Sequence, residues 1–196
     1  MSVQLIMPQH SPSTDATLSV LKTGEHFQAV DGLGSLSLIM DANPVPCFVI
    51  DASHHVVHWN KGCEHILGLP ASRMIGTHDQ WTAFYEKPRA TLADLIVDQQ
   101  VLENDLYKNK KLRHSRIVPN AFEAEDFFPL LGDGGRWLFF TAAPVIDCNG
   151  EIIGAVETLQ DITTQRKAEI ALQESNNQLE NRIAARTLEL AQKFHR

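Results

Sequence analysis

Hydrophobic residues are densest between residues 134 and 163, where their pattern predicts two neighbouring strands. From residue 136 to 145 both alternating sets of side chains are apolar, which is typical of a strand covered on both faces. Trp137 and Phe139 belong to one set and Leu138 and Phe140 to the other. An Asn-Gly pair at 149–150 then favours a hairpin turn. With a return strand at 151–159, the pattern predicts an antiparallel hairpin that leads into a helix.

Alternating patterns predict three more strands upstream of this hairpin. Residues 47–51 and 55–59 flank a short turn at 52–54, and a third strand is expected at 121–129. The sheet predicted from the sequence therefore has five strands in antiparallel order.

Helical spacing of apolar residues separates the second and third of these strands. Short helical turns are expected at 61–67 and 70–76, followed by a longer helix at 91–102 with Thr91 as its N-cap. The polar, basic stretch 104–116 is expected to be a solvated loop or frayed helix, with Tyr107 as its one aromatic residue. The predicted fold class is α+β, with short helices on one face of the sheet.

Both ends of the chain differ in pattern from its middle. Residues 1–32 form a tail with room for one short helix at 16–22, and an amphipathic helix then leads into a domain at 33–163. Residues 164–196 are expected to form a charged helix. Its apolar residues fit a and d positions of a coiled coil, with Asn176 at an a position that favours two strands. The seam residues are Leu172, Asn176, Leu179, Ile183 and Leu190.

Composition narrows the possible functions. The 196 residues carry a net charge of −7, which argues against general affinity for nucleic acid. No apolar run reaches the roughly 18 residues of a membrane span, and no signal peptide is recognisable. Three scattered cysteines are typical of reduced thiols, so we expect a cytoplasmic protein.

The segment 33–163 resembles the PAS domain, a sensing and dimerising module of bacterial signalling proteins, through an ordered series of short motifs. The motifs are Asn43-Pro44, Phe48-Val49-Ile50-Asp51, Val56-Val57-His58-Trp59-Asn60, Gly62-Cys63-Glu64, the glycines Gly68 and Gly76, and Asp161-Ile162-Thr163. The helix after them is similar, over residues 182–190, to the signalling helix that joins PAS modules to histidine kinase or cyclase domains.

The resemblance implies a homodimeric sensor rather than an enzyme. A small ligand would bind between the sheet and the central helices, and Asp161 and Thr163 would couple the sheet to the coiled coil. An output kinase or cyclase domain, or a partner signalling protein, would receive the signal. The candidate pocket residues are His58, Trp81, Phe84, Tyr85, Arg89, Leu95, Ile96, Arg136, Trp137 and Phe139.

Metal and cofactor sites have weaker support in the sequence. His54, His55 and His58 are better interpreted as exposed turn histidines and an opposite-facing strand residue than as metal ligands. Haem is a possible cofactor by resemblance to haem-binding PAS domains, with His78 as the first candidate ligand and His65 and His114 as remoter ones. Flavin is not expected, because Cys63 lacks the Asn-Cys-Arg-Phe-Leu-Gln context of photoreactive PAS domains.

Two alternatives remain open at this point. The chain could be a haem-based gas or redox sensor of the same fold, or an adaptor that assembles partners and binds no ligand. Ligand-dependent stabilisation would separate a sensor from an adaptor, because a ligand that binds only the native state must stabilise it.

Overall fold

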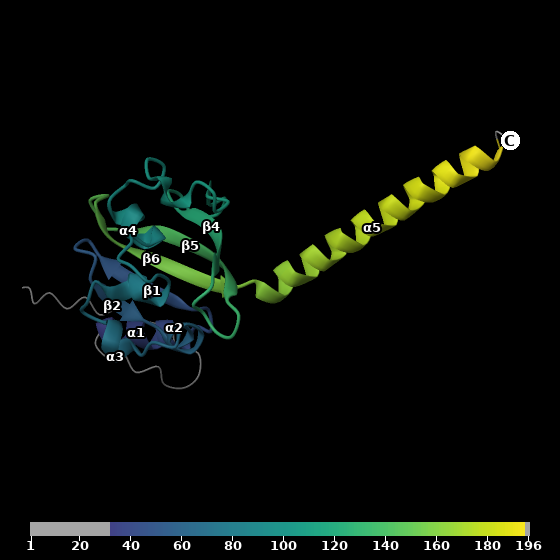
Figure 1. The fold of residues 1–196 in the computed structure, drawn as a ribbon. Helices are drawn as coiled ribbons and strands as arrows, with labels where there is room; N and C mark the ends of the chain where they lie inside the picture. Colours follow the sequence, from purple (N-terminus) through teal and green to yellow (C-terminus); the bar gives the residue numbers. More distant parts are fainter. Residues whose placement is uncertain (1–31, 195–196) are drawn as a thin grey trace, which may run out of the picture.

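The computed structural model describes residues 32–194, which form one α+β domain and a long helix that projects from it (Figure 1). The predicted helix at 16–22 lies outside the described residues. The strands are β1 (Cys47–Asp51), β2 (Val56–Trp59), β3 (Arg113–His114), β4 (Phe122–Phe128), β5 (Arg136–Ile146) and β6 (Ile152–Asp161). The helices are α1 (Gly32–Ala42), α2 (Lys61–Leu67), α3 (Ala71–Met74), η1 (Asp79–Ala83), α4 (Leu92–Val97), η2 (Asp105–Tyr107) and α5 (Thr163–Phe194).

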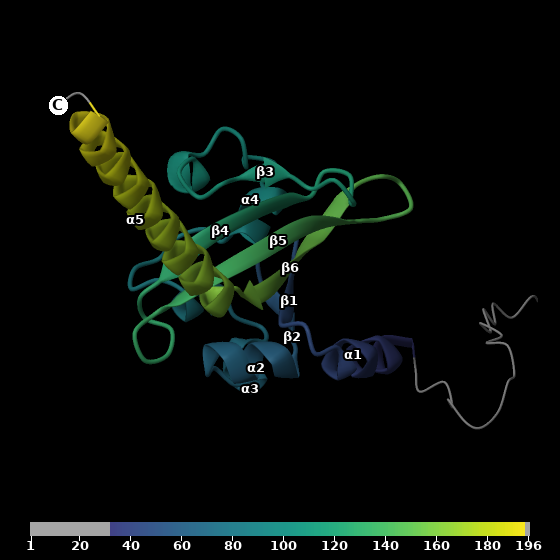
Figure 2. The same ribbon diagram turned by 90° about the vertical axis from the view of Figure 1, so that its right-hand side faces the viewer.

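All strands belong to one antiparallel sheet in the order β2-β1-β6-β5-β4-β3 (Figure 2). The sheet has six strands rather than the predicted five. The additional strand is β3, where Arg113 and His114 pair with Glu123 and Phe122 of β4. A two-residue strand is too short to show alternation, so its sequence resembles a polar loop.

The hydrophobic core lies between the sheet and the helices that cover its inner face. On β5, Leu138, Phe140 and Ala142 are buried in this core, and α4 packs against β5 and β6. Trp137 and Phe139 point to the opposite face, where they are partly exposed. The sequence predicted that both faces of this strand are covered. Among residues 32–194, the inner face is covered as expected, and the outer face stays partly exposed.

Helix α4 is shorter than the predicted helix at 91–102. Thr91 and Asp94 form the expected N-terminal cap, in which the Thr91 hydroxyl accepts from the Asp94 amide and the Asp94 carboxylate accepts from the Thr91 amide. The helix ends at Val97, and Gln99 has a positive φ of 56°. Val101 is buried while Leu102 is exposed, so the helical spacing of the apolar residues continues beyond the helix itself.

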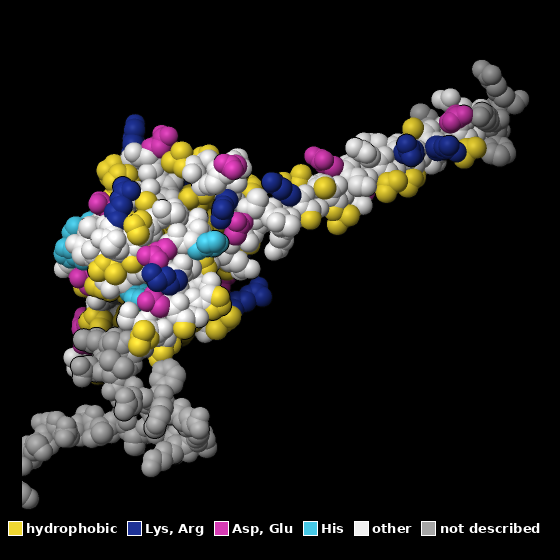
Figure 3. Space-filling model, turned by 90° about the horizontal axis from the view of Figure 1, so that it is seen from below, with side chains coloured by type: hydrophobic (Ala, Val, Ile, Leu, Met, Phe, Trp, Pro, Cys, Tyr) yellow, Lys and Arg dark blue, Asp and Glu magenta, His cyan; other side chains and the backbone are white. Residues whose placement is uncertain are grey.

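Helix α5 begins at Thr163, one residue before the predicted start, and runs to Phe194. Beyond its first turn it projects away from the sheet, and Figure 3 shows hydrophobic side chains exposed at intervals along it. Four of the five seam residues, Leu172, Leu179, Ile183 and Leu190, are more than half exposed in the single chain. Within residues 32–194 no helix is both long and apolar enough to cross a lipid bilayer.

Candidate ligand site

A hollow on the helical side of the sheet lies where the segment between η1 and α4 meets the hairpin of β4 and β5. Its volume is about 640 Å³, within the range of small-molecule sites. Three of the predicted pocket residues, Phe84, Tyr85 and Arg89, line it together. The full lining is Phe84, Tyr85, Glu86, Lys87, Pro88, Arg89, Leu106, Asp126, Phe127, Phe128, Pro129 and Leu130. We call this space the Arg89 hollow.

A cluster of aromatic rings forms the floor of the Arg89 hollow. The ring of Phe128 lies 5.5 Å from that of Phe84 and 5.9 Å from that of Tyr85, measured between centroids. Phe140 continues the cluster, at 6.1 Å from Phe128 and 5.9 Å from Tyr107. The tilted and edge-on arrangements are those that aromatic pairs favour. The floor is consequently apolar.

Polar groups lie close to this aromatic cluster. The phenol oxygens of Tyr85 and Tyr107 lie 3.5 Å apart, and the Tyr107 hydroxyl donates to the carbonyl of Ala90. Burial raises the pKa of Tyr85 to about 12 and also raises the pKa of Tyr107, so both phenols are neutral at physiological pH. Lys110 binds the carboxylate of Asp126, and burial lowers the pKa of this lysine.

A buried carboxyl group lies behind the cluster, on β6. Glu157 is 3% exposed, and its Oε2 accepts a hydrogen bond of 2.8 Å from the amide of Ala93 at the start of α4. Burial raises the pKa of Glu157 to about 8, and the nearby negative charge of Asp94 acts in the same direction. The carboxyl group is therefore mostly protonated at neutral pH.

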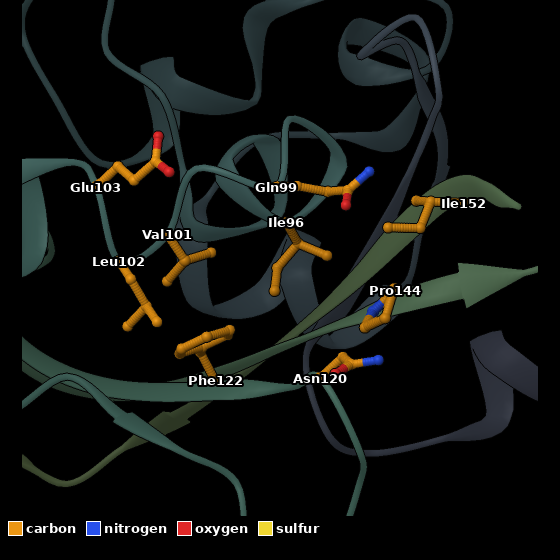
Figure 4. A pocket seen from close by; sticks show the side chains of 9 residues that line it. All are labelled: Ile96, Gln99, Val101, Leu102, Glu103, Asn120, Phe122, Pro144 and Ile152. Carbon is orange, nitrogen blue, oxygen red and sulfur yellow. The ribbon is translucent and has the colours of Figure 1, made fainter.

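A second, smaller hollow of about 330 Å³ lies beyond the C-terminal end of α4 (Figure 4). Ile96 and Val101 lie on one side of it, and Phe122, Pro144 and Ile152 come from three neighbouring strands. Ile96 is the one predicted pocket residue that lines it.

The remaining predicted pocket residues line neither of these two hollows. Leu95 is buried in the core beneath α4, and Trp81 is partly buried on η1. Trp137 and Phe139 point to the outer face of the sheet, because alternate residues of a strand face opposite sides. Arg136 lies 3.5 Å from Asp161, and the Nε2 of His58 lies 3.6 Å from Asp41 of α1.

The histidine candidates also lie outside the Arg89 hollow. His78 is exposed, and its ring lies 4.0 Å from that of His55. It lines neither of the two hollows described above, and haem binding at His78 stays a prediction. His54 was expected to be an exposed turn residue; instead its Nδ1 lies 2.9 Å from Asp94 and its Nε2 lies 3.2 Å from Asp98. No cluster of metal-binding side chains occurs in the part of the chain that the structure describes.

The predicted coupling residues join the sheet to α5 through specific hydrogen bonds. The amide of Trp137 donates to the hydroxyl of Thr163 at 3.0 Å, and the amide of Thr163 donates to Asp161 at 2.9 Å. One turn later, Arg166 forms an ion pair with Glu125 of β4 and lies over the ring of Trp137. The first turn of α5 is thereby attached to both β4 and β5.

A family model described as "PAS domain" matches residues 44–164, more than half of the chain. The chain belongs to the PAS domain family. The resemblance inferred from the sequence is thus confirmed, as is the α+β PAS fold, apart from the number of strands.

The chain is also similar to several solved structures, at low sequence identity. The PAS domain of Bordetella pertussis BvgS is 18% identical, with 75% of this chain and 99% of that chain covered and a TM-score of 0.46. An RNA-binding light-oxygen-voltage receptor is 15% identical, with 74% and 37% covered and a TM-score of 0.52. The PAS domain of nitrogen regulation protein NR(II) from Vibrio parahaemolyticus is 12% identical, with 65% and 97% covered and a TM-score of 0.41. A search among curated proteins gave no match.

The light-oxygen-voltage receptor shares the fold of this domain, while the ligand and partners of this chain stay predictions. The exclusion of nucleic acid in particular stays a prediction, because one neighbour is described as binding RNA.

Sequence reasoning missed four polar residues of the PAS domain that lie at or behind the Arg89 hollow. They are Tyr107, Lys110, Asp126 and Glu157. Two of them had a local signal: Tyr107 is an aromatic residue within a polar run, and Glu157 is an acid within an apolar strand. Lys110 and Asp126 had none, because a solvated loop would contain the same residue types.

Proposed function

We propose that this chain is the sensory and dimerising module of a bacterial signal-transduction protein. A small ligand binds in the Arg89 hollow, and its occupancy changes how the sheet holds α5. The module is not itself an enzyme. The receiving partner is a histidine kinase or cyclase domain, or another signalling protein, as the similarity of residues 182–190 to a signalling helix implies.

One observation carries this proposal: strand β4 lines the hollow and also holds the helix. Asp126, Phe127 and Phe128 line the hollow, while the preceding residue, Glu125, forms the ion pair with Arg166 of α5. A ligand that displaces this part of β4 by a fraction of an ångström would move a charged anchor of the helix directly. Packed interfaces convert such small displacements into discrete rearrangements.

The exposed seam of α5 supports the proposal that the chain dimerises. A single helix with leucine and isoleucine at heptad spacing leaves apolar surface in water unless a second copy covers it. Two parallel copies would place Asn176 opposite Asn176, which favours a two-stranded coil.

Native mass spectrometry of the freshly purified chain tests both parts of the proposal. We expect the mass of a dimer and, in preparations that retain the natural ligand, an additional small mass that is lost on mild activation. Adding the released compound should raise the melting temperature. A chain that retains no compound, and whose melting temperature no metabolite fraction raises, would be an adaptor instead.

A further inference from the structure

Arg89 lies at the edge of the Arg89 hollow and has no acidic partner among the residues that the structure describes. Its guanidinium carbon lies 4.5 Å from the ring centroid of Tyr85 and 5.6 Å from that of Tyr107. Nη2 donates a hydrogen bond of 2.7 Å to the carbonyl of Leu106. Among residues 32–194 no carboxylate forms an ion pair with Arg89, and its Nε is buried without an acceptor.

The acids near this guanidinium are held elsewhere. Asp126 binds Lys110 and also accepts a hydrogen bond of 2.9 Å from the amide of Phe127. Glu157 is held at the start of α4 through the Ala93 amide. Glu86, the remaining acid of the lining, is exposed at the rim with Lys87 beside it. Arg89 therefore keeps donors free in surroundings where an unmet donor is costly.

The rest of the hollow is suited to a flat apolar group. Phe84, Tyr85, Phe128 and Leu106 line the hollow together with Arg89, and prolines at positions 88 and 129 restrict the backbone of its lining. The cation–π contacts with two phenol rings and the hydrogen bond to Leu106 restrain the guanidinium, so less conformational entropy would be lost when it binds an anion.

We propose that the natural ligand is a small organic carboxylate with a flat, apolar body, and that Arg89 binds its carboxylate group. The carboxylate oxygens supply the acceptors that the guanidinium lacks, and paired N–H···O bonds of this kind are among the strongest in proteins. The body of the ligand packs on the aromatic floor. This inference rests on the proposed sensory function and specifies the chemistry of that same site.

Paired probes test the inference on the full chain. Benzoate and phenylacetate are titrated calorimetrically beside their uncharged primary amides, with acetate and inorganic phosphate as anions that lack the apolar body. We expect the aromatic acids to bind at least tenfold more tightly than the amides, acetate or phosphate. Equal binding of acid and amide, equal binding of acetate, or no binding of either aromatic acid at millimolar concentration would overturn the inference.

Variants assign the effect to Arg89. Arg89→Gln should weaken binding of the aromatic acids by roughly 10- to 100-fold, and Arg89→Lys should weaken it less, because the charge remains while the fork geometry is lost. Arg113→Gln is the matched control, since Arg113 lies over Phe139 on the outer face. If R89Q binds as the unaltered chain does, the inference is wrong. If R89Q does not fold, the comparison of acids with amides on the unaltered chain tests the inference.

The inference and the proposed function fail in different ways. If native mass spectrometry shows a retained neutral compound while carboxylates do not bind, the proposed sensory function is supported and the inferred carboxylate ligand is wrong. If the chain retains no compound and neither acids nor neutral metabolites raise its melting temperature, both proposals fail.

Discussion

At the scale of single residues, Asn60 is the most heavily bonded polar side chain in the N-terminal part of the domain. It is fully buried, and its Oδ1 accepts from the amides of Cys47 and Cys63, at 2.9 Å each. Its Nδ2 approaches the carbonyls of Met40, Asn43 and Val45 at 3.2, 3.2 and 2.8 Å. One side chain thus joins the end of α1, the start of β1 and the N-terminus of α2.

Asn60→Ala should lower the free energy of unfolding by about 2–4 kcal/mol, because it leaves several buried backbone groups without partners. Urea denaturation measures the change. Asn177→Ala is the control, since Asn177 is exposed on α5 and its loss should cost less than about 0.5 kcal/mol. A similar small loss for both variants would show that water replaces the hydrogen bonds of Asn60.

Glu157 makes the stability of the domain depend on pH. Its pKa in the folded chain is about 8, against an ordinary value of 4.5, so the folded chain keeps a proton that the unfolded chain releases between these values. The contribution of this proton to the free energy of unfolding is fully present below about pH 4.5 and is lost as the pH rises to about 8.

Glu157→Gln should reduce this pH dependence, because an amide cannot ionise while its oxygen can still accept from Ala93. Denaturation at a series of pH values measures the free energy of unfolding of E157Q and of the unaltered chain. The difference between the two should change by up to about 1.4 kcal/mol per pH unit between about pH 4.5 and pH 8. Glu151→Gln, at the exposed turn of the same hairpin, should leave the slope unchanged. Parallel pH profiles for E157Q and the unaltered chain would contradict the assignment.

At the scale of elements, the first turn of α5 is where the domain and the helix are joined. Asp161 accepts from the amide of Thr163 and lies near Arg136, and these contacts lower the pKa of its carboxyl group despite partial burial. The carboxylate is therefore ionised at neutral pH and can bind the amide that begins the helix.

Asp161→Ala should uncouple α5 from the hollow without preventing ligand binding. We expect faster amide hydrogen exchange in residues 163–167 and loss of any ligand-induced protection there, with ligand affinity changed less than about threefold. The Kd is measured by calorimetry and the exchange by mass spectrometry. Asp147→Ala, at the opposite end of the hairpin, is the control. Equal loss of binding and of coupling would refute the role of Asp161.

At the scale of the whole molecule, the α5 seam leaves apolar side chains uncovered in the single chain. Leu172, Leu179, Ile183 and Leu190 recur at the spacing of a coiled coil, and Figure 3 shows hydrophobic side chains exposed along the projecting helix. A helix of this composition gains little stability from propensity alone and depends on packing against a partner.

Replacing Leu179 and Ile183 with lysine should convert the dimer to a monomer, because two charges per chain would be buried in the seam. Light scattering measures the mass. The control replaces Gln178 and Asn181, which lie off the seam, with lysine and should remain dimeric. A chain of residues 1–164 should dissociate at least as readily as the seam variant. Monomers for every form, including the unaltered chain, would remove the relay mechanism.

The sequence by itself determined those features that depend on local spacing. Periodicity and capping act between residues that are near in sequence. They therefore predicted the hairpin turns, the start of α4, the long α5 and the strands β1, β2, β4, β5 and β6. The ordered motifs that end in Asp161-Ile162-Thr163 also identified the PAS family, because each motif occupies its own place in the chain.

Only the tertiary structure decided which residues share a site. Both alternating sets of β5 are apolar, so the pattern could not show that Leu138 and Phe140 face the core while Trp137 and Phe139 face outward. Tyr85, Arg89, Tyr107 and Asp126 meet through chain folding between distant segments, which no local period encodes. The end of α4 and the strand β3 likewise depend on packing and pairing partners. Local chemistry thus determined the elements, and long-range packing determined the site.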